Sequence, residues 1–129
     1  MVKRISTGSP FERTLGYSRA VVDDDMIYVS GTTGYDYDKM VMPEDVAAQA
    51  RNALETISRV LGDAGGTLRD VVRVRYYLTS AEHVEAITPV LGEYFGDIRP
   101  AATMVVAGLI DPLMKVEIEV TARVGAHFS

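Results

Sequence analysis

The stretch from Arg99 to Ala122, RPAATMVVAGLIDPLMKVEIEVTA, constrains the fold of this chain most strongly. Its first half is an apolar run of the kind found in strands that are buried on both faces. Its second half alternates between apolar and polar side chains, as half-buried strands do. Asp111-Pro112 indicates a turn between them, because proline disfavours helix at the preceding residue. We therefore expect two strands joined by a short connection, with Glu117 and Glu119 on one face of the second strand.

Length, composition and charge limit the classes of protein that the chain can belong to. With 129 residues, 47% of them hydrophobic and 24% charged, it suits one globular domain spanning 1–129. No apolar run reaches the ~20 residues that cross a bilayer, and the first residues lack the apolar core of a signal peptide. We therefore expect a cytoplasmic protein without a membrane partner. A net charge of −5, with lysines and arginines scattered singly, argues against nucleic acid as a partner.

The supply of metal-ligating and nucleophilic residues is small. The chain has no cysteine, which excludes disulfides, thiolate nucleophiles and cysteine-type zinc sites. Of its two histidines, His83 is expected to be solvent-exposed and His127 to lie in a frayed C-terminal tail. Asp36 and Asp38 do not have the spacing of an EF-hand and are interpreted as solvated loop carboxylates. We therefore expect no metal site and no organic cofactor.

The N-terminal half predicts one hairpin and one helix. A short edge strand and a loop are expected over 5–17, a hairpin around three aspartates over 18–30, and a loop over 31–42. Pro43 is expected at the first turn of a helix that stops at Gly65-Gly66. The apolar side chains of this helix recur at the spacing of a single stripe: Val46, Ala50, Ala53, Leu54, Ile57, Val60 and Leu61.

The C-terminal half predicts a strand over 70–79, then a helix capped by Ser80 and ended by Gly96, then the two strands described first. In the strand over 70–79, Val72 is expected to share one face with Val74, Tyr76 and Leu78. Val71 is expected to share the other face with Arg73, Arg75 and Tyr77. Both helices have a single apolar stripe, so both can cover only one face of the sheet. The order of elements predicts an α+β fold. The face of the sheet that the helices leave uncovered is charged, so we expect it to meet either water or a subunit interface that holds a polar cleft.

Six segments of the sequence together resemble one protein family. They are Gly16-Tyr17, VSG at 29–31, DVAAQARNALETISRVLGDAGG at 45–66, DVVRVRYYL at 70–78, YFGDIRPAAT at 94–103 and KVEIEVTA at 115–122. In this order they resemble the Rid family of reactive intermediate deaminases, also called YjgF or endoribonuclease L-PSP proteins. The resemblance implies a chorismate-mutase-like fold in a homotrimer, with the sheets packed around the threefold axis. It also implies ligand clefts between adjacent subunits.

The resemblance places candidate site residues on the chain. Typical members use a glutamate to hold or activate water, a tyrosine after a glycine, and a serine before a glycine, which correspond to Glu119, Tyr17 and Ser30 with Gly31. They also use an arginine in a Pro-Ala-Arg-Ser motif to clamp the substrate carboxylate, and an asparagine in the second helix. Here the arginine position is Ala102, followed by Thr103, and the asparagine position is Thr88.

The missing arginine changes the expected activity. An arginine presents a planar fork to a carboxylate and alanine presents nothing, so its loss should cost ~3 kcal/mol or more of substrate binding and orientation. Efficient hydrolysis of 2-iminoacids is therefore not expected, and the cleft should be more apolar than in typical members. A displaced guanidinium from Arg75, or less readily Arg73, is one hypothesis for a replacement, and a structural salt bridge of Arg75 is the alternative.

Three functional hypotheses follow. The leading one is a trimer with an intersubunit small-molecule cleft, in which Glu119 orients water to hydrolyse an imine, enamine or similar C–N bond. The second is a ligand-binding or protein-interacting trimer without catalysis. The third is a ribonuclease, against which the acidic charge argues. Open alternatives for single residues are that Glu119 only pairs with a strand arginine, and that Tyr17 is an interface aromatic. Met104 and Met114 are expected in the core.

Overall fold

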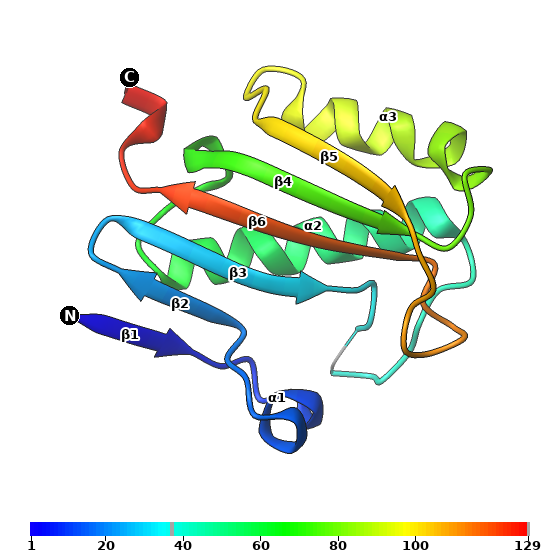
Figure 1. Cartoon of the computed structure of the whole chain (residues 1–129), viewed down its shortest axis with the longest axis horizontal. Helices are drawn as coiled ribbons and strands as arrows, with labels where there is room; N and C mark the ends of the chain where they lie inside the picture. Colours follow the sequence, from blue (N-terminus) through cyan, green and yellow to red (C-terminus); the bar gives the residue numbers. More distant parts are fainter. Residues whose placement is uncertain (37, 129) are drawn as a thin grey trace.

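The computed structural model describes residues 1–36 and 38–128, in which the strands form one mixed sheet in the order β1-β2-β3-β6-β4-β5. The strands are β1 (Val2–Ile5), β2 (Ala20–Asp23), β3 (Met26–Thr32), β4 (Val71–Leu78), β5 (Ala101–Val106) and β6 (Val116–Arg123). The helices are α1 (Pro10–Leu15), α2 (Val46–Asp63) and α3 (His83–Phe95), with short 3-10 turns at Leu68–Asp70 and Ala126–Phe128. Figure 1 shows α2 and α3 on the same face of the sheet, which confirms the predicted α+β arrangement.

Helix α2 supplies the centre of the core. All seven residues of its predicted apolar stripe are buried against the sheet. The helix begins later than predicted, because Asp45 is its N-cap and accepts a hydrogen bond from the backbone N–H of Ala48 at 3.1 Å. An aspartate is among the strongest N-caps, so Pro43 lies before the helix and not in its first turn. The helix ends at Asp63, just before the predicted Gly65-Gly66 stop.

Helix α1 corrects the prediction of a loop up to residue 17. The hydroxyl of Ser9 accepts a hydrogen bond from the backbone N–H of Phe11 at 3.2 Å, and Pro10 occupies the first helical position. Gly16 then ends the helix in a left-handed conformation with φ 76°. Start and stop signals therefore outweighed the loop-like composition. The predicted hairpin is confirmed as β2 and β3. Strand β3 extends to Thr32, so Gly31 lies in a strand and not in the predicted loop. Tyr37, which belongs to that predicted loop, lies outside the described residues.

Strand β5 differs most from prediction. It pairs in parallel with β4 through the α3 crossover, and β4 separates it from β6. All six of its residues are exposed in the single chain, so the predicted strand buried on both faces is wrong here. Met104 is 39% exposed and therefore not in the core, whereas Met114 is buried as predicted. The predicted turn at Asp111-Pro112 is present, and Asp111 accepts a hydrogen bond from the backbone N–H of Leu113 at 2.8 Å.

Two local details of β4 and α3 also depart from prediction. A register irregularity between Val71 and Arg73 buries Val71 and leaves Val72 39% exposed, the reverse of the predicted alternation. Ser80 accepts hydrogen bonds from Glu82 and His83 in the turn before α3, but Glu82 occupies the N-cap position. The helix reaches Phe95 and is capped by Gly96, as predicted. No helix in the described chain is long and apolar enough to cross a membrane.

Candidate functional site

Figure 1 shows that α2 and α3 cover one face of the sheet, and the pairing of the strands places a row of predicted site residues on the opposite face. Glu119 on β6 is paired with Arg75 on β4, and Arg75 is paired with Thr103 on β5. Residues that lie opposite one another in neighbouring strands point to the same face. The fold therefore brings Glu119, Arg75 and Thr103 together on the face that no helix covers.

The Glu119 carboxylate is held from one side. Its Oε1 accepts a short hydrogen bond from the Tyr77 hydroxyl and lies 3.6 Å from Nη1 of Arg75. Every contact described for this carboxylate uses Oε1, so Oε2 is left to accept a proton or a hydrogen bond. Arg75 is close enough to be part of this site, which is compatible both with the displaced-guanidinium hypothesis and with a salt bridge. The sequence placed Tyr77 on this face but did not assign it to the site.

A buried arginine that sequence reasoning missed lies at the other end of the site. The Arg19 side chain is only 1% exposed. Its Nη1 donates to the Gly31 carbonyl at 2.7 Å and to Oγ1 of Thr32 at 3.0 Å, and its Nη2 donates to the Tyr17 hydroxyl at 3.1 Å. Because the Tyr17 hydroxyl accepts a hydrogen bond from a cation, its own proton is left to be donated to a ligand. A lone arginine at the start of a strand carries no sequence signal of burial.

Glu12 balances the charge of Arg19. Oε2 of Glu12 lies 3.5 Å from Nε of Arg19, and the carboxylate also accepts hydrogen bonds from the hydroxyls of Ser6 and Thr7. Burial works to raise the pKa of Glu12, but the hydrogen bonds from Thr7 and Ser6 together with Arg19 outweigh it and lower the pKa. Glu12 is therefore ionised at neutral pH, and the buried ion pair is satisfied by hydrogen bonds on both sides.

Glu117, two residues before Glu119 on the same face, has a different environment. It is partly buried and its carboxylate packs against Gly31, where a Cβ atom would overlap Oε2 of Glu117. Among the described residues, no group donates a hydrogen bond to it. Burial raises the pKa of Glu117; the positive charge of Arg19 opposes the shift and the negative charge of Glu119 adds to it. The strand therefore carries one oriented carboxylate, Glu119, and one whose pKa is raised by its surroundings, Glu117.

Ser30 lies at the junction of these groups. Its hydroxyl donates to the Ser18 carbonyl at 2.6 Å, and its backbone N–H donates to the Arg19 carbonyl at 2.9 Å. The hydroxyl proton of Ser30 is therefore committed to the neighbouring strand, and what remains for a ligand is an acceptor oxygen.

Thr88 and Ala102 are not brought to Glu119 within one chain. Ala102 pairs with the buried Val74, so it points toward the helix side of the sheet, opposite to Glu119. Thr88 is exposed on α3 and its hydroxyl donates to the Val84 carbonyl at 2.7 Å. The predicted site residues thus form two groups on opposite faces.

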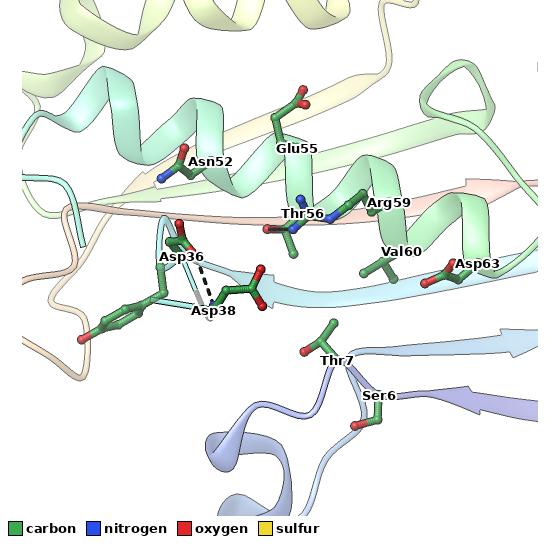
Figure 2. Close-up of a pocket in the computed structure, with 11 residues that line it drawn as sticks. Ser6, Thr7, Asp36, Asp38, Asn52, Glu55, Thr56, Arg59, Val60 and Asp63 are labelled. Atoms are coloured by element: carbon green, nitrogen blue, oxygen red, sulfur yellow. Dashed lines mark hydrogen bonds between the residues drawn. The ribbon is translucent and has the colours of Figure 1, made fainter. Parts of the chain in front are cut away.

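Hollows in the described chain also lie away from Glu119, and two of them are lined by residues that the sequence analysis singled out. The first, of about 320 Å³, is lined by Val74, Tyr76, Phe95, Gly96, Arg99, Pro100 and Ala102. The second, of about 660 Å³, lies between α2 and the end of β1 and is shown in Figure 2; its lining includes Asp36, Asp38, Glu55, Arg59 and Asp63. Asp36 also accepts backbone hydrogen bonds in its own loop. In the described chain, no group of three His, Cys, Asp or Glu side chains is arranged to hold a metal ion.

The fold and this arrangement define a small α+β protein that presents a polar sheet face. The family model for Endoribonuclease L-PSP matches residues 8–124, and the chain belongs to this family, which includes the YjgF and Rid proteins. A homotrimer is typical of its members. The chain is 34% identical over 126 residues to an uncharacterized protein of Streptomyces coelicolor, covering 97% of this chain and 94% of that one.

Solved structures agree with this assignment. A Mycobacterium tuberculosis member of the YjgF/YER057c/UK114 family is 43% identical, with a TM-score of 0.87 over 96% of this chain and 100% of that one. A Rid-family protein of unknown function from Yersinia pestis is 27% identical, with a TM-score of 0.84 over 96% and 100%. The predicted family and fold class are confirmed.

Proposed function

We propose that the chain forms a homotrimer whose intersubunit clefts bind a small molecule, and that Glu119 orients a water there to hydrolyse an imine, an enamine or a similar C–N bond. The observation that carries the proposal is the asymmetric hold on Glu119. Tyr77 and Arg75 fix its carboxylate through Oε1, and Oε2 stays available to a water molecule. A carboxylate held in one orientation is suited to accept a proton from attacking water.

The separation of the predicted residues supports a cleft shared between subunits. The group around Glu119 and the group of Thr88 and Ala102 lie on opposite faces, so one chain cannot close a site around both. Strand β5 is exposed along its whole length and carries apolar side chains that a neighbouring subunit would cover. The cleft would then combine Tyr17, Ser30, Gly31, Arg75, Thr103 and Glu119 of one subunit with Thr88 and Ala102 of the next.

The two carboxylates can divide the proton transfers. Glu119 takes a proton from water as the water oxygen bonds to the imine carbon and the C=N electron pair moves to nitrogen. Glu117, in its protonated form, gives its proton to that nitrogen to form a carbinolamine. In the collapse of the carbinolamine, Glu119 returns its proton to the nitrogen and the hydroxyl proton passes to Glu117, so that the C–N bond breaks, ammonia leaves with a carbonyl compound, and both carboxylates regain their starting forms. Burial raises the pKa of Glu117, which suits this residue to the role of the acid.

The residue at position 102 narrows the class of substrate. With alanine at position 102, the clamp that aligns a 2-iminoacid in typical members is missing, so we expect such substrates to be poor. A ligand-binding trimer without catalysis is the second candidate, and the absence of an arginine at this position favours it. A net charge of −5 disfavours an endoribonuclease.

Ammonia release from freshly generated imines tests the proposal. We expect wild type to exceed the buffer rate and Glu119→Gln to fall at least ~100-fold, in the range found when a positioned acid or base is lost. Glu93→Gln is the control, because Glu93 is an exposed carboxylate paired with Arg51 on the helix side. A wild-type rate equal to buffer, with a ligand still bound, would favour the binding trimer.

Mixed trimers test the shared cleft. Glu119→Gln and Ala102→Trp, each inactive alone, would disable opposite halves of the site. Because each cleft draws its two halves from different subunits, random co-assembly should restore about one quarter of wild-type activity. No recovery in verified mixed trimers would show that each site is built within one chain.

A further inference from the structure

We propose that Arg19 is a positioning residue of the candidate site, which holds a bulge of β3 opposite Glu119 and turns the hydroxyl proton of Tyr17 toward the ligand. The Arg19 side chain is 1% exposed, so it acts through the groups that it holds and not by touching a ligand. This inference rests on the proposed function, because it assigns a role in that reaction. The hold of Arg19 on β3 can be measured without turnover, so the two proposals can fail separately.

Strand β3 has one residue too many opposite Glu119. The register of β3 with β6 shifts by one residue between Val29 and Thr32, so that Ser30 and Gly31 together lie opposite Glu119. An extra residue of this kind is a β-bulge, which interrupts the ladder, bends the strand and changes the direction of nearby side chains. Bulges are frequent next to active sites. The position of Glu119 relative to Ser30 and Gly31 therefore depends on the shape of this bulge.

Arg19 supplies hydrogen-bond partners to the backbone of the bulge. Its Nη1 donates to the Gly31 carbonyl at 2.7 Å and to Oγ1 of Thr32 at 3.0 Å. The Thr32 hydroxyl donates in turn to the Ser30 carbonyl at 2.8 Å, and the Ser30 N–H donates to the Arg19 carbonyl at 2.9 Å. Buried carbonyl groups are costly when they lack a partner. The bulge thus keeps its shape because Arg19 and Thr32 satisfy both of its carbonyls.

The same guanidinium fixes the direction of the Tyr17 proton. Nη2 of Arg19 donates to the Tyr17 hydroxyl at 3.1 Å, and Cζ lies 5.4 Å from the centre of the Tyr17 ring. A guanidinium has no acceptor, so the hydroxyl proton points away from it. Tyr17 is 36% exposed, which lets this proton reach a ligand at the surface of the chain. A hydrogen bond received from a cation also makes the hydroxyl a stronger donor.

Arg19 therefore joins two parts of the site through one planar group. Nη1 holds the bulge and Nη2 holds Tyr17, while Nε lies 3.5 Å from Oε2 of Glu12. A lysine would keep the positive charge beside Glu12, but an ammonium is a point donor and cannot span both Tyr17 and the bulge. In the proposed reaction, the bulge keeps Glu119 aligned, and Tyr17 selects substrates that present a hydrogen-bond acceptor.

The kinetics of ammonia release separate the two effects, measured with the freshly generated imine that wild type hydrolyses fastest. Tyr17→Phe should raise KM by about ten-fold and change kcat little, because it removes one hydrogen bond to the ligand. Thr32→Val disturbs the bulge and spares Tyr17, so it should lower kcat by about ten-fold at an unchanged KM. Arg19→Gln should do both. In the Tyr17→Phe background, Arg19→Gln should lower kcat without raising KM further.

Two further variants separate positioning from stability. Arg19→Lys keeps the charge that balances Glu12 and should still lower kcat/KM by about ten-fold or more. Wild-type kinetics in Arg19→Lys would show that Arg19 only balances Glu12 and would overturn the proposal. Asp70→Asn is the matched control, because it alters a buried, hydrogen-bonded charge beside the C-terminal turn and should leave kcat and KM unchanged. Equal kinetic losses in Asp70→Asn and Arg19→Gln would also overturn the proposal.

Amide hydrogen exchange tests the hold of Arg19 on β3 without substrate. Arg19→Gln should speed exchange of the Ser30 N–H by at least about ten-fold more than Asp70→Asn does, because the bulge opens locally. If Arg19→Gln does not fold, Thr32→Val takes its place in both measurements. Equal exchange in the variant and the control would overturn the proposal. If wild type releases no ammonia, the proposed hydrolysis fails, and faster Ser30 exchange would still support the hold of Arg19 on the bulge.

Discussion

Arg75 and Glu119 face each other across β4 and β6, with Nη1 of Arg75 3.6 Å from Oε1 of Glu119. Both side chains are 37% exposed, so water screens the pair and its contribution to folding is small. The pair therefore orients the carboxylate more than it stabilises the sheet.

Arg75→Gln separates these two roles. We expect the free energy of unfolding in urea to change by less than about 1 kcal/mol, because exposed ion pairs contribute about that much at most. We expect hydrolysis to fall by about ten-fold or more, because Glu119 loses one of the two groups that hold it. Arg51→Gln breaks a similarly exposed pair and should leave hydrolysis unchanged. A large loss of stability with normal turnover would show that Arg75 is structural.

Glu117 should make stability fall as pH rises. Its pKa is raised in the folded state from an ordinary value of 4.5, chiefly by burial, so the folded chain holds a proton that the unfolded chain has released. Stability from this group is complete below pH 4.5 and is lost as pH rises through the folded pKa. Unfolding of wild type and Glu117→Gln at a series of pH values should show the variant gaining on wild type above pH 4.5. Parallel curves would contradict the raised pKa.

Asp70 should have the opposite dependence. Burial works to raise its pKa, but hydrogen bonds from the His127 ring and from the backbone of Thr67 and His127 outweigh it and hold the pKa below 3.8. Its stabilisation is therefore complete above pH 3.8 and is lost as pH falls through the folded pKa.

Asp70→Asn tests this effect, because the variant places a neutral amide where the carboxylate accepts hydrogen bonds. We expect a loss of about 1–3 kcal/mol at pH 7, typical of a buried hydrogen-bonded group, and a smaller difference from wild type near pH 3. Asp63→Asn, at an exposed position, is the control. A difference that does not change between these pH values would reject the role of ionised Asp70.

Gln49 should be the most sensitive polar residue of α2. It is fully buried; its amide nitrogen donates to the carbonyls of Pro43 at 2.7 Å and Leu113 at 3.0 Å, and its oxygen accepts from the N–H of Lys115 at 2.9 Å. Gln49→Ala leaves all three backbone groups unpaired, so we expect a loss of about 2–4 kcal/mol in urea unfolding. Asn52→Ala, which removes one hydrogen bond to Gly34, should cost about 1 kcal/mol. Equal losses in the two variants would contradict this account.

The spacing of apolar residues correctly predicted the elements that are buried within the single chain. The stripe of α2 and the alternation of β6 report burial against the core, and both are present. The same interpretation of the apolar residues of β5 was wrong, because all six are exposed in the single chain. An apolar run does not show whether a strand is buried by its own chain or, as in the proposed trimer, by a neighbouring subunit. The irregularity between Val71 and Arg73 in β4 could not be predicted either. One extra residue in a strand moves the side chains before it to the opposite face of the sheet and leaves no mark in the composition.

The candidate site divides in a similar way. Family motifs located Glu119 and Tyr17, because their spacing lies within short segments. Arg19, Tyr77 and the C-terminal contact of His127 depend on partners far away in the sequence, which no local pattern encodes. The expectation of a frayed tail at His127 was wrong for that reason, because its ring bonds to Asp70.

The bare edge of β5 has a consequence for how the chain must be handled. From Ala101 to Ile110 there is no charged residue and no proline, the two devices that natural edge strands use against stray pairing. A single chain offers this edge to any extended peptide, including another copy in the wrong register. In the proposed trimer, assembly and protection from aggregation would be one event, and a variant that weakens the proposed subunit contacts should be lost as insoluble protein before its activity can be assayed.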